Sequence, residues 1–175
     1  FSGLHNQGKR LVVIFDEATG IHPGRWVQLE GLMTSANIKF IGIGNPTSRS
    51  SEFFRCFRSP EYFKINLSCF DSPNLIANGV TTMEDLEAEL NFLKSLNDVD
   101  RQARLKSYKI VQPKLLTLLW VMAKAMKWGL KHPLFVSKVL GQFPEDDTNA
   151  LIPLRVVEDA MERDALDAGQ ARSIG

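Results

Sequence analysis

Two neighbouring carboxylates at the end of an apolar run are the residues best suited to act on a phosphate group. Asp16 and Glu17 directly follow residues 11–15 (LVVIF) of this 175-residue chain. Asp16 would hold Mg²⁺ through water, and Glu17 would orient and deprotonate an attacking water. Side chains alternate along an extended strand, so one acid can face the metal while the next reaches the γ-phosphate. The alternative is a solvated acidic pair that opens a loop.

A second polar segment, Gly44-Asn45-Pro46-Thr47, follows the next apolar run of the chain. Ligands of parallel α/β sheets bind outside the carboxyl ends of the strands. If the two strands are neighbours, Asn45 lies beside the acidic pair. Its amide could then bond the γ-phosphate or the attacking water and so sense hydrolysis. The alternative is a plain Asn-Pro turn, which is common after strands.

Three arginines, Arg49, Arg55 and Arg58, follow this turn. An arginine can stabilise phosphate charge within its own subunit or across to a neighbouring one. Arg49 is the candidate for facing the phosphate. Surface ion pairs are the competing interpretation for all three.

The elements that position these residues alternate between strand and helix over the first 70 residues. The apolar runs predict strands at 11–15, 38–44 and 62–67, separated by helices at 25–33 and 51–57. This alternation is typical of an α/β fold with a parallel sheet. Strands with continuous apolar runs are expected to be buried on both faces.

The rest of the chain is predicted to be mostly helical. Helices are expected at 82–96, with Thr82 as N-cap, and at 114–128, 132–140 and 156–166. No role is assigned to residues 78–112. The predicted domain organisation follows: residues 1–74 form part of an α/β core, 75–144 a helical subdomain and 145–175 a linker.

The charge of the chain is distributed unevenly, although the total is only +1. Residues 1–144 carry 18 basic and 12 acidic side chains, whereas residues 145–175 carry 3 basic and 8 acidic. The segment 101–144 has nine Lys or Arg and no Asp or Glu. Such a segment can face a polyanion. The alternative is a solvated helix face whose acidic partners come from elsewhere in the fold.

Composition and cysteine content exclude several classes of protein. Hydrophobic residues make up 44% and charged residues 23%, which is ordinary for a globular chain and excludes disordered and collagen-like polymers. The longest apolar stretch, residues 115–126, is too short to span a bilayer. Two cysteines, Cys56 and Cys69, are expected to be apolar fillers rather than nucleophiles, and no His or Cys spacing fits a zinc site.

Nine segments occur in an order that carries more information than any one of them. In chain order they are LVVIFDEATG (11–20), Trp26 with Leu29, FIGIGNPT (40–47), Phe53-Phe54, DSPN (71–74), Trp128-Gly129, HPLF (132–135), VLGQFP (139–144) and LIPL (151–154). Together they resemble the large subunit of tailed-bacteriophage terminase, and the resemblance covers most of the chain. A strand ending in Asp-Glu is generic to many ATPases, whereas its ordered combination with GNPT, DSPN and LGQFP is much more specific.

The resemblance implies a role for each of the candidate residues. Asp16 and Glu17 correspond to the Walker B pair, with Asp16 at the Mg²⁺ and Glu17 as the catalytic carboxylate. Residues 44–47 correspond to the coupling motif, which links hydrolysis to movement of DNA. The implied fold is a partial P-loop NTPase of three layers with parallel strands, followed by a mostly helical segment, and the implied ligands are ATP and Mg²⁺.

The resemblance also implies a biological setting. The family uses ATP to package viral double-stranded DNA into a procapsid and cuts the DNA with a C-terminal RNase H-like nuclease domain. The implied partners are double-stranded DNA, the portal protein of the procapsid, the small terminase subunit and further copies of the chain in a ring, with no membrane. The implied location is the cytoplasm of an infected or lysogenic bacterial host, and transiently the procapsid portal.

Two parts of the family pattern are missing from these 175 residues. No G-x-x-x-x-G-K-[ST] loop occurs, and the metal-binding Asp of the nuclease would follow a segment like residues 172–175. We therefore expect a fragment of a longer ATPase that is inactive alone. The alternatives are another P-loop motor of nucleic acids, such as a helicase, and a non-catalytic binding module in which the acidic pair only caps a loop.

Overall fold

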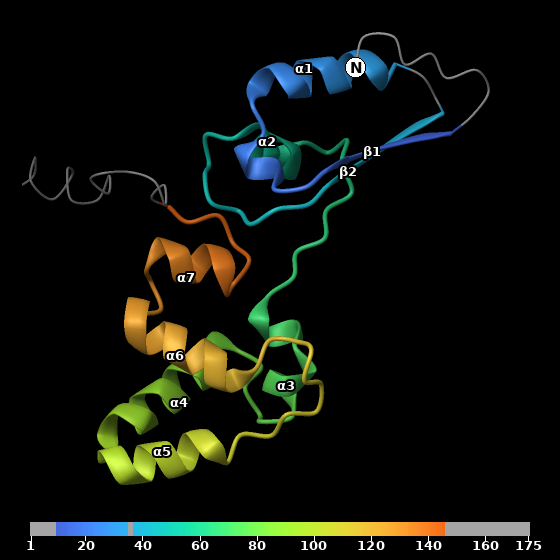
Figure 1. Ribbon diagram of the computed structural model, residues 1–175. Coiled ribbons are helices and arrows are strands. Elements are labelled where there is room, and N and C mark those ends of the chain that lie inside the picture. The colour runs from blue at the N-terminus through green and yellow to red at the C-terminus, as the bar shows by residue number, and fades with distance from the viewer. Residues whose placement is uncertain (1–9, 35–36, 146–175) are drawn as a thin grey trace, which may run out of the picture.

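The computed structural model describes residues 10–34 and 37–145 (Figure 1). Within these ranges the chain is a mixed α/β structure with two parallel strands and seven α-helices. The elements in chain order are β1 (Leu11–Phe15), α1 (Pro23–Leu32), β2 (Ile38–Gly42), α2 (Glu52–Arg58), α3 (Pro73–Ile76), α4 (Met83–Ser95), α5 (Asp98–Lys106), α6 (Leu118–Trp128) and α7 (Pro133–Lys138). Two short 3-10 helices, Ala18–Gly20 and Cys69–Asp71, complete the set.

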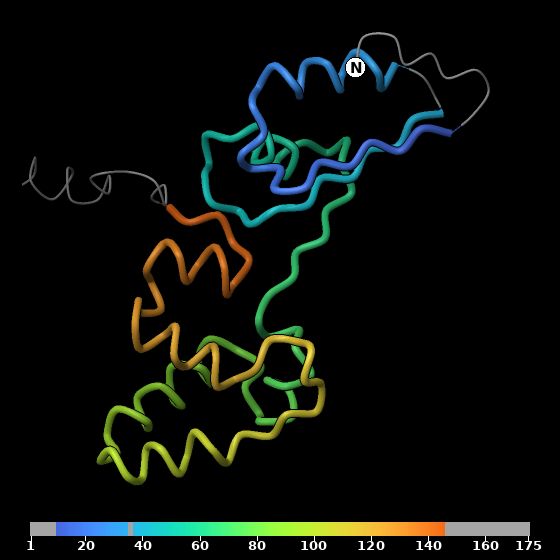
Figure 2. Tube along the Cα trace, in the orientation of Figure 1, coloured from blue at the N-terminus to red at the C-terminus, as the bar shows by residue number. Residues whose placement is uncertain are grey.

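The elements form two groups that an extended stretch connects (Figure 2). The sheet group contains β1, β2, α1 and α2, and the helical group contains α3 to α7. Each group has its own buried hydrophobic cluster. The predicted boundaries at residues 74/75 and 144/145 remain predictions. The predicted helix at 156–166 lies outside the described residues.

The sheet group is a strand–helix–strand unit, as the sequence pattern predicts. Strand β1 pairs in parallel with β2, with Phe15 opposite Gly42. Parallel neighbours need a crossover, and α1 supplies it. Helix α1 begins after His22, whose Nδ1 accepts a hydrogen bond from the backbone N–H of Gly24, and Pro23 occupies the first helical position.

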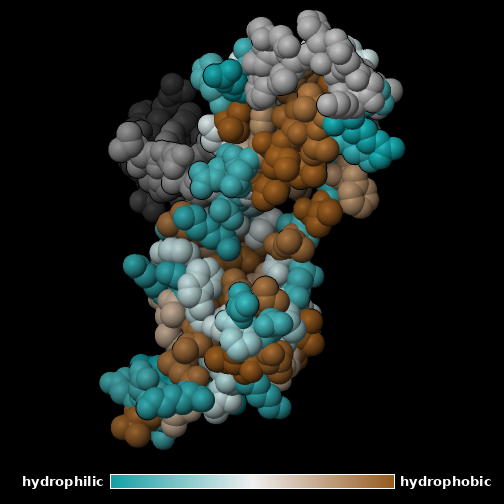
Figure 3. Space-filling model, turned by 45° about the vertical axis from the view of Figure 1, so that its right-hand side comes forward, coloured by the Kyte–Doolittle hydropathy of each residue, from teal (hydrophilic) through white to brown (hydrophobic). Residues whose placement is uncertain are grey.

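One face of the sheet carries the core of this group. Phe15 packs edge-on against Trp26 of α1, with 5.0 Å between ring centroids. Phe53 of α2 is buried in the same cluster. The prediction that both faces are buried is wrong for the described residues, because Val12 is 49% exposed and Ile14 59% exposed. The described side chains that pack on the sheet come from one face only, and Figure 3 shows hydrophobic surface at this end of the molecule.

The third predicted strand, at residues 62–67, does not form. These residues carry no strand assignment, and Phe63, Ile65 and Leu67 are 92%, 68% and 75% exposed. A strand needs a neighbouring strand to satisfy its backbone groups and a packed face to bury its apolar side chains. The described residues supply neither here, so the apolar pattern by itself produces only an extended connection.

The helical group largely follows its predicted helices. Helix α4 begins at the predicted N-cap Thr82, whose hydroxyl oxygen accepts a hydrogen bond from the Asp85 N–H while the Asp85 carboxylate accepts one from the Thr82 N–H. Helix α6 begins at Leu118 rather than at residue 114, because Thr117 caps it. Helix α7 is shorter than the predicted 132–140 and ends at Lys138.

Helix α5 falls within the residues to which the sequence assigned no role. It has no buried residue, and five of its nine side chains are charged, so it is too polar to show the broad apolar face by which helices are recognised. Its start was nevertheless readable, since Asn97 caps it and two aspartates occupy its first turn. No helix among the described residues has both the length and the apolar character that a membrane span requires.

Candidate functional site

The carboxyl ends of β1 and β2 meet at one edge of the sheet. The N–H of Ile43 donates to the carbonyl of Phe15, and the N–H of Ala18 donates to the carbonyl of Ile43, both at 2.8 Å. The backbone hydrogen bonds between the two segments therefore continue beyond the end of each strand. These bonds place the acidic pair Asp16-Glu17 beside Gly44 and Asn45, as expected if the strands are neighbours.

Gly44 allows the two loops to touch. A Cβ at this position would lie 3.0 Å from the Ala18 nitrogen and 3.5 Å from the Glu17 carbonyl carbon. A hydroxyl then ties the loops together, because Thr19 Oγ1 donates to the carbonyl of Asn45 at 2.6 Å. The same carbonyl accepts the N–H of Thr47 at 2.9 Å. The turn after β2 is thus fixed against the turn after β1.

Glu17 has a strained backbone. Its φ of 51° and ψ of 44° are left-handed, and among the described residues it is the one non-glycine with positive φ. An L-residue pays about 1–2 kcal/mol for this conformation. Asp16 supports the turn, since its Oδ1 accepts the Glu17 N–H at 2.9 Å. Such strain concentrates at functional sites, where it aims a side chain.

Both carboxylates of the pair are exposed to solvent. Within residues 10–34 and 37–145, neither Asp16 nor Glu17 takes part in an ion pair. The backbone of the loops is therefore fixed while the acidic groups stay accessible. This is the arrangement that a metal–phosphate ligand would require.

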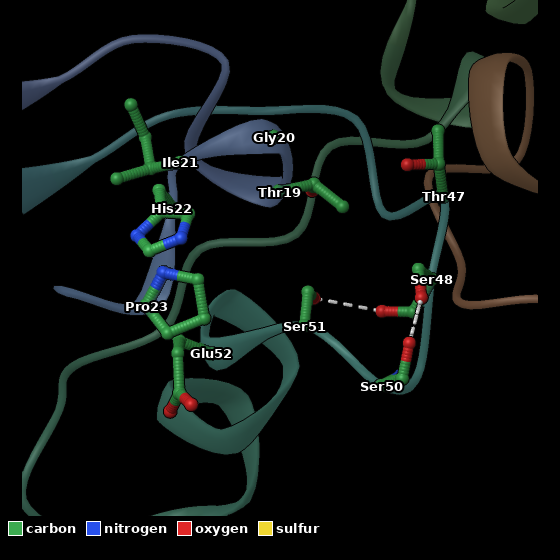
Figure 4. Close-up of a pocket in the computed structure, with 10 residues that line it drawn as sticks. All are labelled: Thr19, Gly20, Ile21, His22, Pro23, Thr47, Ser48, Ser50, Ser51 and Glu52. Carbon is green, nitrogen blue, oxygen red and sulfur yellow. Dashed lines mark hydrogen bonds between the residues drawn. The ribbon is translucent and has the colours of Figure 1, made fainter. Parts of the chain in front are cut away.

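A hollow of about 430 Å³ lies next to these loops (Figure 4). It is lined by residues 19–23, by Thr47 and Ser48, and by residues 50–52. Ser48 and Ser50 share a hydrogen bond of 2.7 Å between their hydroxyls, and the Ser51 hydroxyl donates to the Ser48 carbonyl. The lining includes neither the acidic pair nor any Lys or Arg. The hollow is a hydroxyl-rich neighbour of the acidic pair, without the cations that cradle a phosphate.

Arg49 has a partner far away in the sequence. Its Nη2 donates to the carbonyl of Phe143 at 3.1 Å, and the side chain is otherwise exposed. Arg55 pairs with Glu52 at 2.6 Å, and the guanidinium of Arg58 lies 6.0 Å from the centre of the Phe54 ring. Arg49, the residue predicted to face the phosphate, therefore binds the backbone carbonyl of Phe143 in the described structure.

Residues 139–143, which we call the strap, join the helical group to the sheet group. The ring of Phe143 lies among three rings of α2, with centroid distances of 6.1 Å to Phe53, 4.8 Å to Phe54 and 5.4 Å to Phe57. At Gly141, whose φ is +65°, a Cβ would overlap the carbonyl oxygen of Leu67. The LGQFP motif was part of the resemblance, but its pairing with α2 carries no local signal in the sequence.

The DSPN motif has a structural task. Asn74 is fully buried, and its side-chain nitrogen donates to the carbonyls of Gln112, Leu115 and Leu116 at 2.8–3.3 Å. Its Oδ1 accepts the N–H groups of Val111 and Gln112, both at 2.9 Å. One side chain thus holds five backbone groups of the connection between α5 and α6, and Asn78 and Ser72 also bond residues of it, Lys109 and Leu116. The proline turn was readable from sequence, but the distant partners of Asn74 were not.

The two cysteines fit packing better than catalysis. Cys69 is buried in the helical core, and burial raises the pKa of its thiol to about 11. Cys56 is half-buried, and desolvation raises the pKa of its thiol as well. Neither thiol is therefore activated as a thiolate. No group of three or more metal-ligating side chains occurs within residues 10–34 and 37–145.

Comparisons with protein families, with curated proteins and with solved structures give no significant match for this chain.

Proposed function

We propose that this chain is part of a viral terminase large subunit, in which ATP hydrolysis with Mg²⁺ drives double-stranded DNA into a procapsid. The observation that carries the proposal is the contact between the two predicted motifs. The strained turn at Glu17 is bonded to the turn at Asn45, across the close approach that Gly44 permits. Generic acidic turns need neither the strain nor this partner.

The residues fit a Mg²⁺–nucleotide ligand. Proteins bind Mg²⁺ through one or two carboxylates, with water and substrate phosphates completing the shell. Asp16 offers one exposed carboxylate at a strand end, which matches this mode. When bound, Mg²⁺ neutralises charge on the β- and γ-phosphates of ATP.

Glu17 is proposed to orient and deprotonate the attacking water. Glu17 is the left-handed residue of the pair, and we propose that the two carboxylates act on different groups. The upstream phosphate-cradling loop is proposed to lie in a part of the full-length protein outside these 175 residues. This assignment belongs with the proposed P-loop NTPase fold, for which the parallel strand–helix–strand unit is the support.

Coupling of hydrolysis to movement is proposed to run through the Asn45 turn. The turn is bonded to Thr19 on the catalytic side. A few residues later, Arg49 binds the strap, and the strap continues into the helical group. A change at the γ-phosphate would therefore have a continuous, bonded route to the helical group.

Double-stranded DNA is proposed to bind the basic segment 101–144. Two of its nine cations form ion pairs, since Arg101 pairs with Asp98 and Arg104 with Glu89. The seven lysines of the segment make no ion pair with any described residue. Phosphate-backbone contacts require positive charge and no base reading. The portal protein, the small terminase subunit, a homo-oligomeric ring and a location in the cytoplasm of a bacterial host follow from the resemblance alone.

A helicase-like motor is the nearest alternative, and it would share the acidic strand. The order of the motifs up to LGQFP favours the terminase. A binding module without catalysis would have no need for a strained Glu17.

The DNA that encodes the chain tests the proposal. A Gly-Lys-Ser/Thr loop upstream and a metal-binding Asp shortly downstream of residue 175 are expected. The protein carrying both should hydrolyse ATP in the presence of double-stranded DNA, whereas the 175 residues alone should not. Turnover by the isolated 175 residues, or an upstream sequence without a lysine loop, would overturn the proposal.

A further inference from the structure

The outward side of α6 is unusually apolar for an exposed helix face. Its inward side buries Leu118, Val121, Met122 and Ala125 in the helical core. On the outward side Leu119 is 44% exposed, Trp120 39% and Met126 39%. Leu119, Ala123 and Met126 follow one another at spacings of four and three residues, so they form one exposed stripe, with Trp120 at its edge; we call this surface the α6 outer face. Exposed apolar patches of this kind mark interaction sites.

Lysines border the α6 outer face. The Nζ of Lys124 lies 5.4 Å from the centre of the Trp120 ring and 4.9 Å from that of Trp128. Lys127 and Lys131 are exposed at the C-terminal end of the helix. None of the three lysines makes an ion pair with a residue in the described ranges. The partner that fits this surface is therefore both apolar and acidic.

The chain itself contains such a segment. Residues 145–175 carry 8 acidic and 3 basic side chains. Within the predicted helix at 156–166, Val156, Val157, Ala160 and Met161 would share one side. Glu158 and Glu162, four residues apart, would lie on another side of the same helix. Its apolar stripe and acidic flank match the apolar surface and lysine border of α6.

A connection of ten residues leads from the last described residue to the predicted helix. Glu145 is the last described residue and follows the strap, which itself follows α7, and α7 packs on α6. Ten residues, 146–155, separate this point from the predicted helix. Extended, they span roughly 33 Å, whereas the 11 residues of α6 are about 16 Å long. The connection is therefore about twice as long as the helix on which the segment is proposed to dock.

We propose that residues 156–166 dock as a helix on the α6 outer face of the same chain, held by apolar contact and by ion pairs to Lys124, Lys127 and Lys131. This inference does not depend on the proposed ATPase function. It gives three lysines of the basic segment an internal partner and leaves Lys106, Lys109, Lys114 and Lys138 for the DNA backbone. The near-zero net charge of the chain is then partly an internal pairing of opposite charges.

Zero-length carbodiimide cross-linking of the full 175-residue chain, followed by mass spectrometry, tests the docking. The expected products join Lys124, Lys127 or Lys131 to the carboxylates at 158, 159 and 162. Their yield should be independent of protein concentration and should fall at least several-fold in 1 M NaCl, because ion pairs at the surface are screened by salt. A mixture of isotopically labelled and unlabelled chains should yield these products within one chain.

Charge reversal sharpens the test. Lys127→Glu with Lys131→Glu should abolish the cross-links from Lys124, and adding Glu158→Lys with Glu162→Lys should restore cross-links between the two elements with the charges exchanged. Lys106→Glu on α5 is the matched control and should leave the yield unchanged.

Several outcomes would overturn the docking. One is equal cross-linking of the tail to Lys106 and to Lys127. Another is products that join a labelled with an unlabelled chain in the share that random pairing gives, which would make the partner a second copy. A third is persistence of the products after charge reversal. Tryptophan emission gives an independent readout, since reversing the tail charges should shift the emission of Trp120 toward longer wavelength. If reversal of the tail charges leaves the emission of the parent chain unchanged, the burial of this face is contradicted. The Trp120→Phe variant shows how much of any shift belongs to the other tryptophans.

Discussion

The contact of the strap with the connection between the two groups can be tested at a single glycine. Gly141 has a φ of +65°, and a Cβ there would overlap the backbone carbonyl of Leu67. Gly79 has a comparable φ of +73°, but a Cβ there would meet nothing within 4 Å. The two glycines therefore share the backbone conformation and differ in the space around it.

The expected magnitudes follow from this difference. Gly79→Ala is expected to cost about 1–2 kcal/mol in free energy of unfolding, from the left-handed backbone alone. Gly141→Ala has the same cost plus about 1–3 kcal/mol for overpacking against a carbonyl that cannot rotate away. The stabilising effect of replacing glycine on the unfolded chain applies to both variants and cancels in the comparison.

Urea unfolding of both variants, followed by circular dichroism, measures the difference. The midpoint of Gly141→Ala should lie clearly below that of Gly79→Ala, with a melting temperature lower by roughly 2–4 °C for each kcal/mol. Equal midpoints would refute the argument that the strap is seated against Leu67.

Three further predictions concern single side chains. Glu17→Gly should raise the free energy of unfolding by up to about 1 kcal/mol, because the relief of about 1–2 kcal/mol of left-handed strain exceeds the roughly 0.4–1 kcal/mol that glycine costs through the unfolded chain; urea titration of the variant checks this, and a loss of stability would contradict the strain. Asn74→Ala should lower the free energy of unfolding by about 2–4 kcal/mol, since buried backbone groups of the α5–α6 connection lose their partners. Asn91→Ala, on the exposed side of α4, should change it by less than about 0.5 kcal/mol. Equal effects in the two urea titrations would refute the role of Asn74. Hydrogen bonds from Arg104 lower the pKa of Glu89 below its ordinary 4.5, so the stability that this carboxylate contributes is present above pH 4.5 and is lost as the pH falls through the lowered value. In acid titrations Glu89→Gln should flatten this part of the stability profile, and an unchanged slope would exclude the pair as its source.

The local pattern was enough to predict the strand–helix–strand unit. Apolar runs and a helix with Trp26 and Leu29 on its inner side specify β1, α1 and β2, and the parallel order follows from the crossover. The prediction failed at residues 62–67, where the same kind of apolar run found no neighbour. Periodicity reports what a segment can bury, but it does not report whether a partner is present.

The sequence was enough to predict that the two strand-end segments meet, but not the contacts that hold them together. The types Asp, Glu and Asn at two strand ends indicated where polar groups would meet. The left-handed turn at Glu17 and the Thr19 bond to the Asn45 carbonyl come from backbone geometry that residue types do not encode. The ring cluster around Phe143 and the bonds of Asn74 join positions far apart in the chain, so a sequence pattern of local period could not reveal them.

ATP turnover by the Glu17→Gln variant tests the central claim most directly, in a longer protein that carries the proposed phosphate loop. The variant keeps the size and the strained backbone of Glu17 but cannot accept a proton from water. It should bind ATP as the parent does, while hydrolysis falls by roughly 10²–10⁴-fold. Glu30→Gln, at an exposed position of α1, should hydrolyse at the parent rate. Parent-like turnover in Glu17→Gln would contradict the assignment of Glu17 as the catalytic carboxylate.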